Sequence, residues 1–212
     1  MKLFADRAEA GRLLAARLRE KHYPRPVVFA LPRGGLPVAV EIARALDAPL
    51  DLALVRKIGH PLQPELAIGA IVDGETPELV INEDLEYVIE RFPEEIERTK
   101  EKALQELARR RALYLKDRKR AEVEGATVIV VDDGLATGAT ARAALRALRR
   151  QNPARLVLAI PVAPLETVRA LAVEADEIVC LETPEEFYAV GQFYRDFTQL
   201  EDADVARYLS RL

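Results

Sequence analysis

Val128-Ile-Val-Val-Asp-Asp-Gly-Leu-Ala-Thr-Gly-Ala-Thr140 joins a strand pattern to a loop of small and hydroxylated residues. Its first four residues are β-branched and apolar, which is typical of a strand buried on both faces of a parallel sheet. Asp132 and Asp133 follow, and after the loop an Ala-, Leu- and Arg-rich run over 141–150 predicts a helix. Because ligands of open α/β sheets bind beyond the carboxyl ends of the strands, we expect a ligand site at this loop.

The chemistry of the loop favours a phosphorylated sugar. The first N–H groups of a helix lack internal partners and lie at the positive end of the helix dipole, so they bind phosphate well. The residues expected to hold the phosphate are Ala136, Thr137, Gly138, Ala139 and Thr140. Ionised Asp132 and Asp133 accept hydrogen bonds, which suits ribose hydroxyls or a Mg²⁺ held through water. A phosphate site beside a diol site describes a ribose 5-phosphate.

The stretch from Asp132 to Thr140, behind its apolar strand, resembles the 5-phosphoribosyl-1-diphosphate (PRPP) signature of type I phosphoribosyltransferases. The apolar run, the acidic pair and the Thr-Gly-x-Thr ending all match. The alternative is a structural strand-to-helix turn. A P-loop is excluded because no Lys follows Gly138, and no G-x-G-x-x-G is present. The resemblance implies an α/β fold, a doubly wound and mostly parallel sheet with helices on both faces and a small hood.

Composition bounds the remaining classes of protein. The 212 residues are 50% hydrophobic and 31% charged, and alternating β and α patterns predict a single domain with a core over about 25–182. The net charge of −4 does not favour binding to DNA, which is itself negatively charged. One cysteine, Cys180, cannot form an internal disulfide, and we expect a cytoplasmic protein with a structural thiol there. The charged opening is unlike a signal peptide, and no apolar run is long enough for a membrane span.

A second strand–turn–helix unit carries Pro32-Arg33-Gly34-Gly35 between a strand over 27–31 and a helix over 36–46. Arg33 supplies a guanidinium fork for phosphate oxygens, and the two glycines permit close backbone approach. Taken alone, this is a glycine turn with a surface arginine. The turn also resembles the diphosphate loop of the family, which implies diphosphate binding by Arg33, Gly34 and Gly35 and a cis peptide at Pro32–Arg33.

A strand over 50–55 is expected to lead into the basic, proline-punctuated loop Arg56-Lys57-Ile-Gly-His60, before a strand over 66–72. The loop resembles the flexible catalytic loop of the family, which implies that Arg56 and Lys57 close over the diphosphate and exclude water. The alternative is a solvated basic loop. The role of His60 stays open.

The other segments carry less chemistry. We expect a helix over about 7–21 whose Arg and Glu residues form a solvated face, a helix over 83–90, and a long helix over 93–118 that packs on the sheet or in a dimer. Strands over 155–162 and 177–181 flank a helix over 165–173.

The hood is expected from the N-terminal helix, from 183–212, or from both. The tail over 187–197 is dense in aromatic residues in a chain that is 6% aromatic. Aromatic rings stack on planar bases, and Tyr188, Val190 and Phe193 are the candidates to line a base. A hydrophobic cluster that pins the tail is the equal alternative.

The resemblance implies a phosphoribosyltransferase of nucleotide and nucleoside metabolism, with Asp132, Asp133, Arg56 and Lys57 as catalytic residues. It would bind Mg²⁺-PRPP and transfer the 5-phosphoribosyl group to a nitrogen nucleophile such as a nucleobase, with release of diphosphate. Mg²⁺ is the implied cofactor, and a homodimer is implied only by family habit. Two alternatives stay open: a non-catalytic regulatory protein that senses PRPP or nucleotides, and a transferase that takes an amine from a partner protein.

Overall fold

The computed structural model describes residues 2–74, 77–81, 85–115 and 118–210. Its centre is a five-stranded parallel sheet with the strand order β2-β1-β6-β7-β8. The strands are β1 (Pro26–Ala30), β2 (Leu50–Leu52), β6 (Thr127–Val131), β7 (Arg155–Val162) and β8 (Glu177–Glu182). Every residue of β6 is buried, as expected of the middle strand of a sheet that is covered on both faces.

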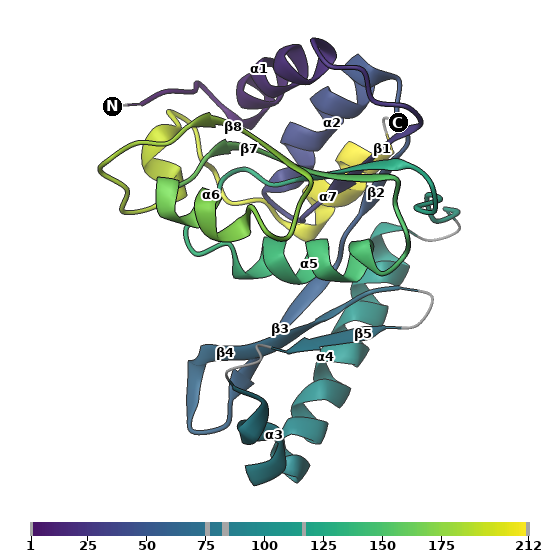
Figure 1. Cartoon of the computed structure of the whole chain (residues 1–212), viewed down its shortest axis with the longest axis vertical. Coiled ribbons are helices and arrows are strands. Elements are labelled where there is room, and N and C mark those ends of the chain that lie inside the picture. Colours follow the sequence, from purple (N-terminus) through teal and green to yellow (C-terminus); the bar gives the residue numbers. More distant parts are fainter. Residues whose placement is uncertain (1, 75–76, 82–84, 116–117, 211–212) are drawn as a thin grey trace.

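Helices cover both faces of this sheet (Figure 1). They are α1 (Arg7–Arg19), α2 (Gly35–Leu46), α5 (Ala139–Arg149), α6 (Leu165–Leu171) and α7 (Asp202–Leu209). Alternate strand residues point to opposite faces: Val28 and Ile129 pack in one core with α1, α2 and α7, whereas Val27 and Val128 pack in another with α5 and α6. The doubly wound fold predicted from the sequence is confirmed.

A second sheet projects from the core and forms an arm (Figure 1). Its three antiparallel strands, in the order β3-β4-β5, are β3 (Val55–His60), β4 (Gln63–Val72) and β5 (Glu78–Ile81). The helices α3 (Glu86–Arg91) and α4 (Pro93–Tyr114) complete the arm. The arm sheet lies between two helices, since Ile58 and Ile71 pack in the core that includes α4, while Ala70 and Val80 pack against Ala143 of α5.

Two predictions about this region were wrong. The expected strand over 50–55 ends at Leu52, and Val55 instead begins β3, where it pairs with Val72. Arg56, Lys57 and His60 therefore lie in a strand and not in a loop. Part of the cause is local. Exposed cations and a glycine obscure the strand pattern, and the ladder itself is irregular, with register shifts between Ile58 and His60.

The remaining boundaries differ by a few residues. The first helix ends at Arg19, the long helix ends at Tyr114, and the helix expected over 83–90 begins at Glu86, with 83–84 outside the described residues. The long helix packs on β3 and β4, which belong to the sheet of the arm and not to the parallel sheet that was expected. Among the described residues, no helix is both long and apolar enough to cross a membrane.

Candidate active site

The two turns that were expected to bind phosphates meet at one edge of the parallel sheet. A Cβ atom added to Gly35 would lie 2.5 Å from the carbonyl oxygen of Val131, and one added to Gly34 would lie 2.1 Å from Oδ2 of Asp133. Both distances are far inside van der Waals contact. A side chain at position 35 would collide with backbone, whereas one at position 34 would displace the Asp133 carboxylate. The glycine turn after β1 is thus packed directly against the acidic pair after β6, and its Pro32–Arg33 peptide is cis, as the resemblance implied.

The small-residue loop leads directly into the N-terminus of α5. Gly138 adopts the left-handed conformation with φ 70° and immediately precedes the helix at Ala139, a conformation that is costly for residues with a Cβ. Ala136 and Thr137 are exposed, and the Ala136 carbonyl accepts a hydrogen bond from the Thr167 hydroxyl at 2.6 Å. The loop therefore presents the N-terminal end of α5 on a braced backbone.

The acidic pair is poorly solvated. Asp133 is buried and Asp132 is half-buried. Burial raises the pKa of Asp132 well above its usual value, and the neighbouring Asp133 carboxylate raises it further. Burial also raises the pKa of Asp133, against the opposing effect of Arg7. Two carboxylates held together at a sheet edge with raised pKa values are characteristic of functional sites, because folding alone gains nothing from them.

Arg7, which the sequence analysis assigned to a solvated face, is a component of this site. Its Nε donates to Oδ2 of Asp133 at 2.7 Å, and the two side chains are only 11% and 12% exposed. Its guanidinium also lies 3.8 Å from the ring centroid of Phe197. The expectation of a solvated face was wrong for Arg7. Helical periodicity does not single it out, since its partner lies on another element far along the chain.

The candidate diphosphate arginine is tethered in this structure. Nη1 of Arg33 lies 3.5 Å from Oδ1 of Asp202 at the start of α7. Asp202 also accepts hydrogen bonds from the Tyr114 hydroxyl and from Arg109 on α4. The contact joins the glycine turn, the long helix and the C-terminal helix.

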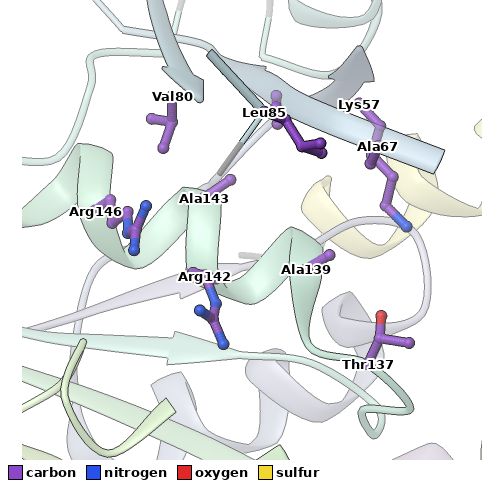
Figure 2. Close-up of a pocket in the computed structure, with 11 residues that line it drawn as sticks. Lys57, Ala67, Val80, Leu85, Thr137, Ala139, Arg142, Ala143 and Arg146 are labelled. Carbon is purple, nitrogen blue, oxygen red and sulfur yellow. The ribbon is translucent and has the colours of Figure 1, made fainter. Parts of the chain in front are cut away.

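A cleft of about 480 Å³ lies between the arm sheet and α5 (Figure 2). Lys57 and Thr137 point toward one another across it. Lys57 is directly opposite Ala70 in the ladder, on the sheet face that packs on α5, whereas Arg56 is opposite Ile71 on the face toward α4. The structure thus brings Lys57, but not Arg56, to the phosphate loop. The lining residues are Lys57, Ala67, Gly69, Ala70, Val80, Leu85, Thr137, Ala139, Arg142, Ala143 and Arg146.

The three residues proposed to line a base lie in different surroundings. Tyr188 is exposed, and Phe193 is buried, with its ring 5.2 Å from that of Phe187. Val190, in the short 3-10 helix η2 (Val190–Phe193), touches the loop after the acidic pair: its Cγ1 is 2.6 Å from where a Cβ on Gly134 would lie. The tail also forms the hydrophobic cluster that was the alternative expectation, with Phe4, Tyr194 and Val162 at its centre.

Two further side chains have local roles. His60 accepts a hydrogen bond from the Leu62 N–H at 3.1 Å in the turn between β3 and β4, and its ring packs edgewise on Phe92. Burial raises the pKa of Cys180 to about 11, so it is a thiol at neutral pH. No group of three or more His, Cys, Asp or Glu side chains within the described ranges is arranged to hold a metal ion.

The profile of the phosphoribosyl transferase domain family matches residues 4–198. The chain therefore belongs to this family, and its architecture is that of the type I phosphoribosyltransferases. Over 211 residues it is 47% identical to proteins of two Mycobacterium tuberculosis strains that are provisionally named phosphoribosyl transferases. The match covers 100% of this chain but 47% of those proteins, so the chain spans about half of their length.

Solved structures also resemble the chain. The crystal structure of the protein TT1426 from Thermus thermophilus is 41% identical, with a TM-score of 0.87 over 100% of this chain and 99% of that one. A protein from Aquifex aeolicus is 13% identical, with a TM-score of 0.53 over 87% of this chain and 78% of that one. The second likeness concerns the fold alone.

Proposed function

We propose that this protein binds Mg²⁺-PRPP and transfers its 5-phosphoribosyl group to a nitrogen nucleophile, with release of diphosphate. The observation that carries the proposal is the packing of Gly34 against the Asp133 carboxylate, which joins the diphosphate turn to the acidic pair. The phosphate loop begins at the next residue, Gly134. One site that accepts hydrogen bonds from a diol and two sites that donate hydrogen bonds to phosphates lie at the same edge of the sheet. They match the chemical groups of PRPP, and family membership supports this assignment.

Each part of the site has a chemical role in this proposal. The backbone N–H groups and hydroxyls of 136–140 hold the 5-phosphate, and Asp132 and Asp133 accept the ribose hydroxyls. The Arg33 turn and Lys57 stabilise the negative charge that develops on the departing diphosphate. Arg56 would join them only if the arm rearranged, because β3 directs it to the opposite face. The carboxylates also stabilise positive charge that develops on the ribosyl ring, so catalysis rests on positioning and electrostatics.

The donor set suits Mg²⁺. This ion prefers oxygen ligands and is commonly held by one or two carboxylates together with substrate phosphates. Asp132 offers a half-buried carboxylate that no basic side chain engages in a described ion pair, whereas Arg7 occupies one oxygen of Asp133. When bound with PRPP, the ion would neutralise diphosphate charge, with Asp132 and Asp133 contacting it through water.

The acceptor is proposed to be a nucleobase-like compound. Val190 lies beside Gly134 at the carboxyl edge of the sheet, where a base attached to the ribose would extend, and the exposed Tyr188 precedes it by two residues. The tail over 183–212 and the N-terminal helix would together form the hood. We also propose that the protein acts in the cytoplasm as a homodimer and serves nucleotide and nucleoside metabolism.

The test is calorimetric titration of the protein with PRPP in the presence of Mg²⁺, repeated with the double variant Asp132→Asn/Asp133→Asn. We expect binding by the wild type and its loss in the folded variant. The same wild-type protein is then assayed for diphosphate release with PRPP and each of a panel of purine and pyrimidine bases. Binding without release for any base would replace the enzyme by the PRPP-sensing alternative, and absence of binding would refute both.

A further inference from the structure

Arg7 joins the two ends of the chain to the acidic pair. It is the first residue of α1, and its Nε donates to Oδ2 of Asp133. Its Nη1 donates to the carbonyl oxygen of Thr198 at 2.9 Å, and Phe197 packs on the face of the guanidinium. A planar, multidentate cation held by three different partners has little freedom to turn. Its direction, and with it that of Oδ2, is set by the tertiary structure.

The rest of Asp133 is held just as closely. Its backbone carbonyl accepts a hydrogen bond from the buried Tyr194 hydroxyl at 2.6 Å. On another side, Gly34 lies so close to Oδ2 that no side chain fits between them. A carboxylate has lone pairs for several hydrogen bonds. Arg7 engages Oδ2, which leaves Oδ1 as the acceptor that the proposed function requires for a ligand hydroxyl.

A contribution of Arg7 to stability alone would not require this arrangement. Replacing a buried ion pair by apolar residues is often neutral or stabilising, so such a pair is weak evidence for a purely structural role. The other arginines of α1, such as Arg12 and Arg17, are exposed. Arg7 differs from them in being directed at a residue of the proposed ribose site.

We infer that Arg7 is a positioning residue, which fixes the Asp133 carboxylate so that the acidic pair recognises the ribose hydroxyls. This inference rests on the proposed function. The guanidinium compensates the charge of a buried carboxylate and fixes its orientation, and ligand hydroxyls then find their acceptor already in place. Arg7 itself need not touch the ligand.

The experiment compares two small probes by calorimetry, ribose 5-phosphate and 2-deoxyribose 5-phosphate, which differ by one hydroxyl. One hydrogen bond to a charged acceptor corresponds to a preference of ~10-fold or more. We expect the wild type to show this preference for ribose 5-phosphate. We expect Arg7→Gln to reduce it to less than ~3-fold while its affinity for 2-deoxyribose 5-phosphate stays unchanged, because the phosphate loop is intact.

Two further variants make the comparison specific. Arg7→Lys keeps the charge and should restore part of the preference, whereas Arg12→Gln, a matched change at an exposed position of the same helix, should keep all of it. If Arg7→Gln does not fold, Phe197→Leu provides the test, because it removes the ring that orients the guanidinium and should also weaken the preference.

The outcomes separate the two proposals. Full preference in folded Arg7→Gln, or equal loss of affinity for both probes, overturns the role of Arg7 and leaves the proposed function standing. The same holds if Phe197→Leu, used in its place, keeps the preference. If the wild type binds both probes equally, the site does not recognise the ribose hydroxyl, and the proposed function then fails together with this inference.

Discussion

The core and the arm contribute to the candidate site in different ways. In the core, the acidic pair and the glycine turn are packed against each other at the ends of strands that are buried on both faces. In the arm, Lys57 is exposed on a strand of a separate sheet, and it faces the core across a cleft. In the proposed function, the ribose and the 5-phosphate would therefore contact the core alone, whereas the diphosphate would contact both the glycine turn of the core and Lys57 of the arm. Substitutions in the two regions should therefore have different effects.

The largest effect is expected from Gly34→Ala in the core. The new methyl group would overlap the Asp133 carboxylate, which must shift together with its partner Arg7. Overpacking of this kind costs about 1–3 kcal/mol of stability. Displacing this acceptor of a ribose hydroxyl, together with the turn proposed to hold the diphosphate, should weaken Mg²⁺-PRPP binding by ~100-fold. Urea unfolding and calorimetry measure the two quantities, and unchanged binding would mean that this carboxylate does not contact the ligand.

An intermediate effect is expected from Lys57→Gln in the arm. Loss of one cation that faces the diphosphate should weaken Mg²⁺-PRPP binding by ~10-fold. The Tm should not change, because Lys57 is exposed and has no described ion pair to lose. Arg56→Gln, on the opposite face of β3, and Lys102→Gln, on the exposed side of α4, are the matched controls, each expected within ~2-fold of wild type. A larger loss in Arg56→Gln than in Lys57→Gln would show that the arm rearranges on binding.

The smallest effect, of opposite sign, is expected for the stability of Asp132→Asn without ligand or Mg²⁺. Burial, and then the nearby Asp133, raise the pKa of Asp132, so the folded state favours the protonated form. The resulting penalty is absent below the pKa of the unfolded chain, about 4, and is complete above the raised pKa. Asn keeps the acceptor for the Asp133 N–H but removes the charge.

Asp132→Asn should therefore raise the Tm at about pH 8 by roughly 2–4 °C, which corresponds to ~1 kcal/mol in a protein of this size. The gain should shrink toward about pH 4, where both proteins are uncharged at this position. Thermal denaturation followed by circular dichroism at a series of pH values provides the measurement. A lower Tm at high pH would show that the carboxylate stabilises the fold and is not held there for function.

The core was predictable from sequence because its signals are local. The run 128–131 has no polar residue. The glycines at 34, 35 and 138 lie between a strand pattern and the helix pattern that follows it. The arm was not predictable to the same degree. In β3 the adjacent exposed cations Arg56 and Lys57 interrupt the alternation, and the buried Ile58 packs in the core that includes α4, which follows later in the chain. The mistaken loop over 56–60 follows from that dependence.

The sequence by itself determined the alternating α/β order, the acidic pair, the two glycine-containing turns and the resemblance that connects them. It did so because strand, turn and helix-start preferences act over a few neighbouring residues. Only the tertiary structure decided which cation meets which carboxylate. Arg7 reaches Asp133, Asp202 holds Arg33, and Lys57 but not Arg56 faces the phosphate loop. Such pairings join distant segments, and they are set by the packing of α1, α7 and the arm against the sheet.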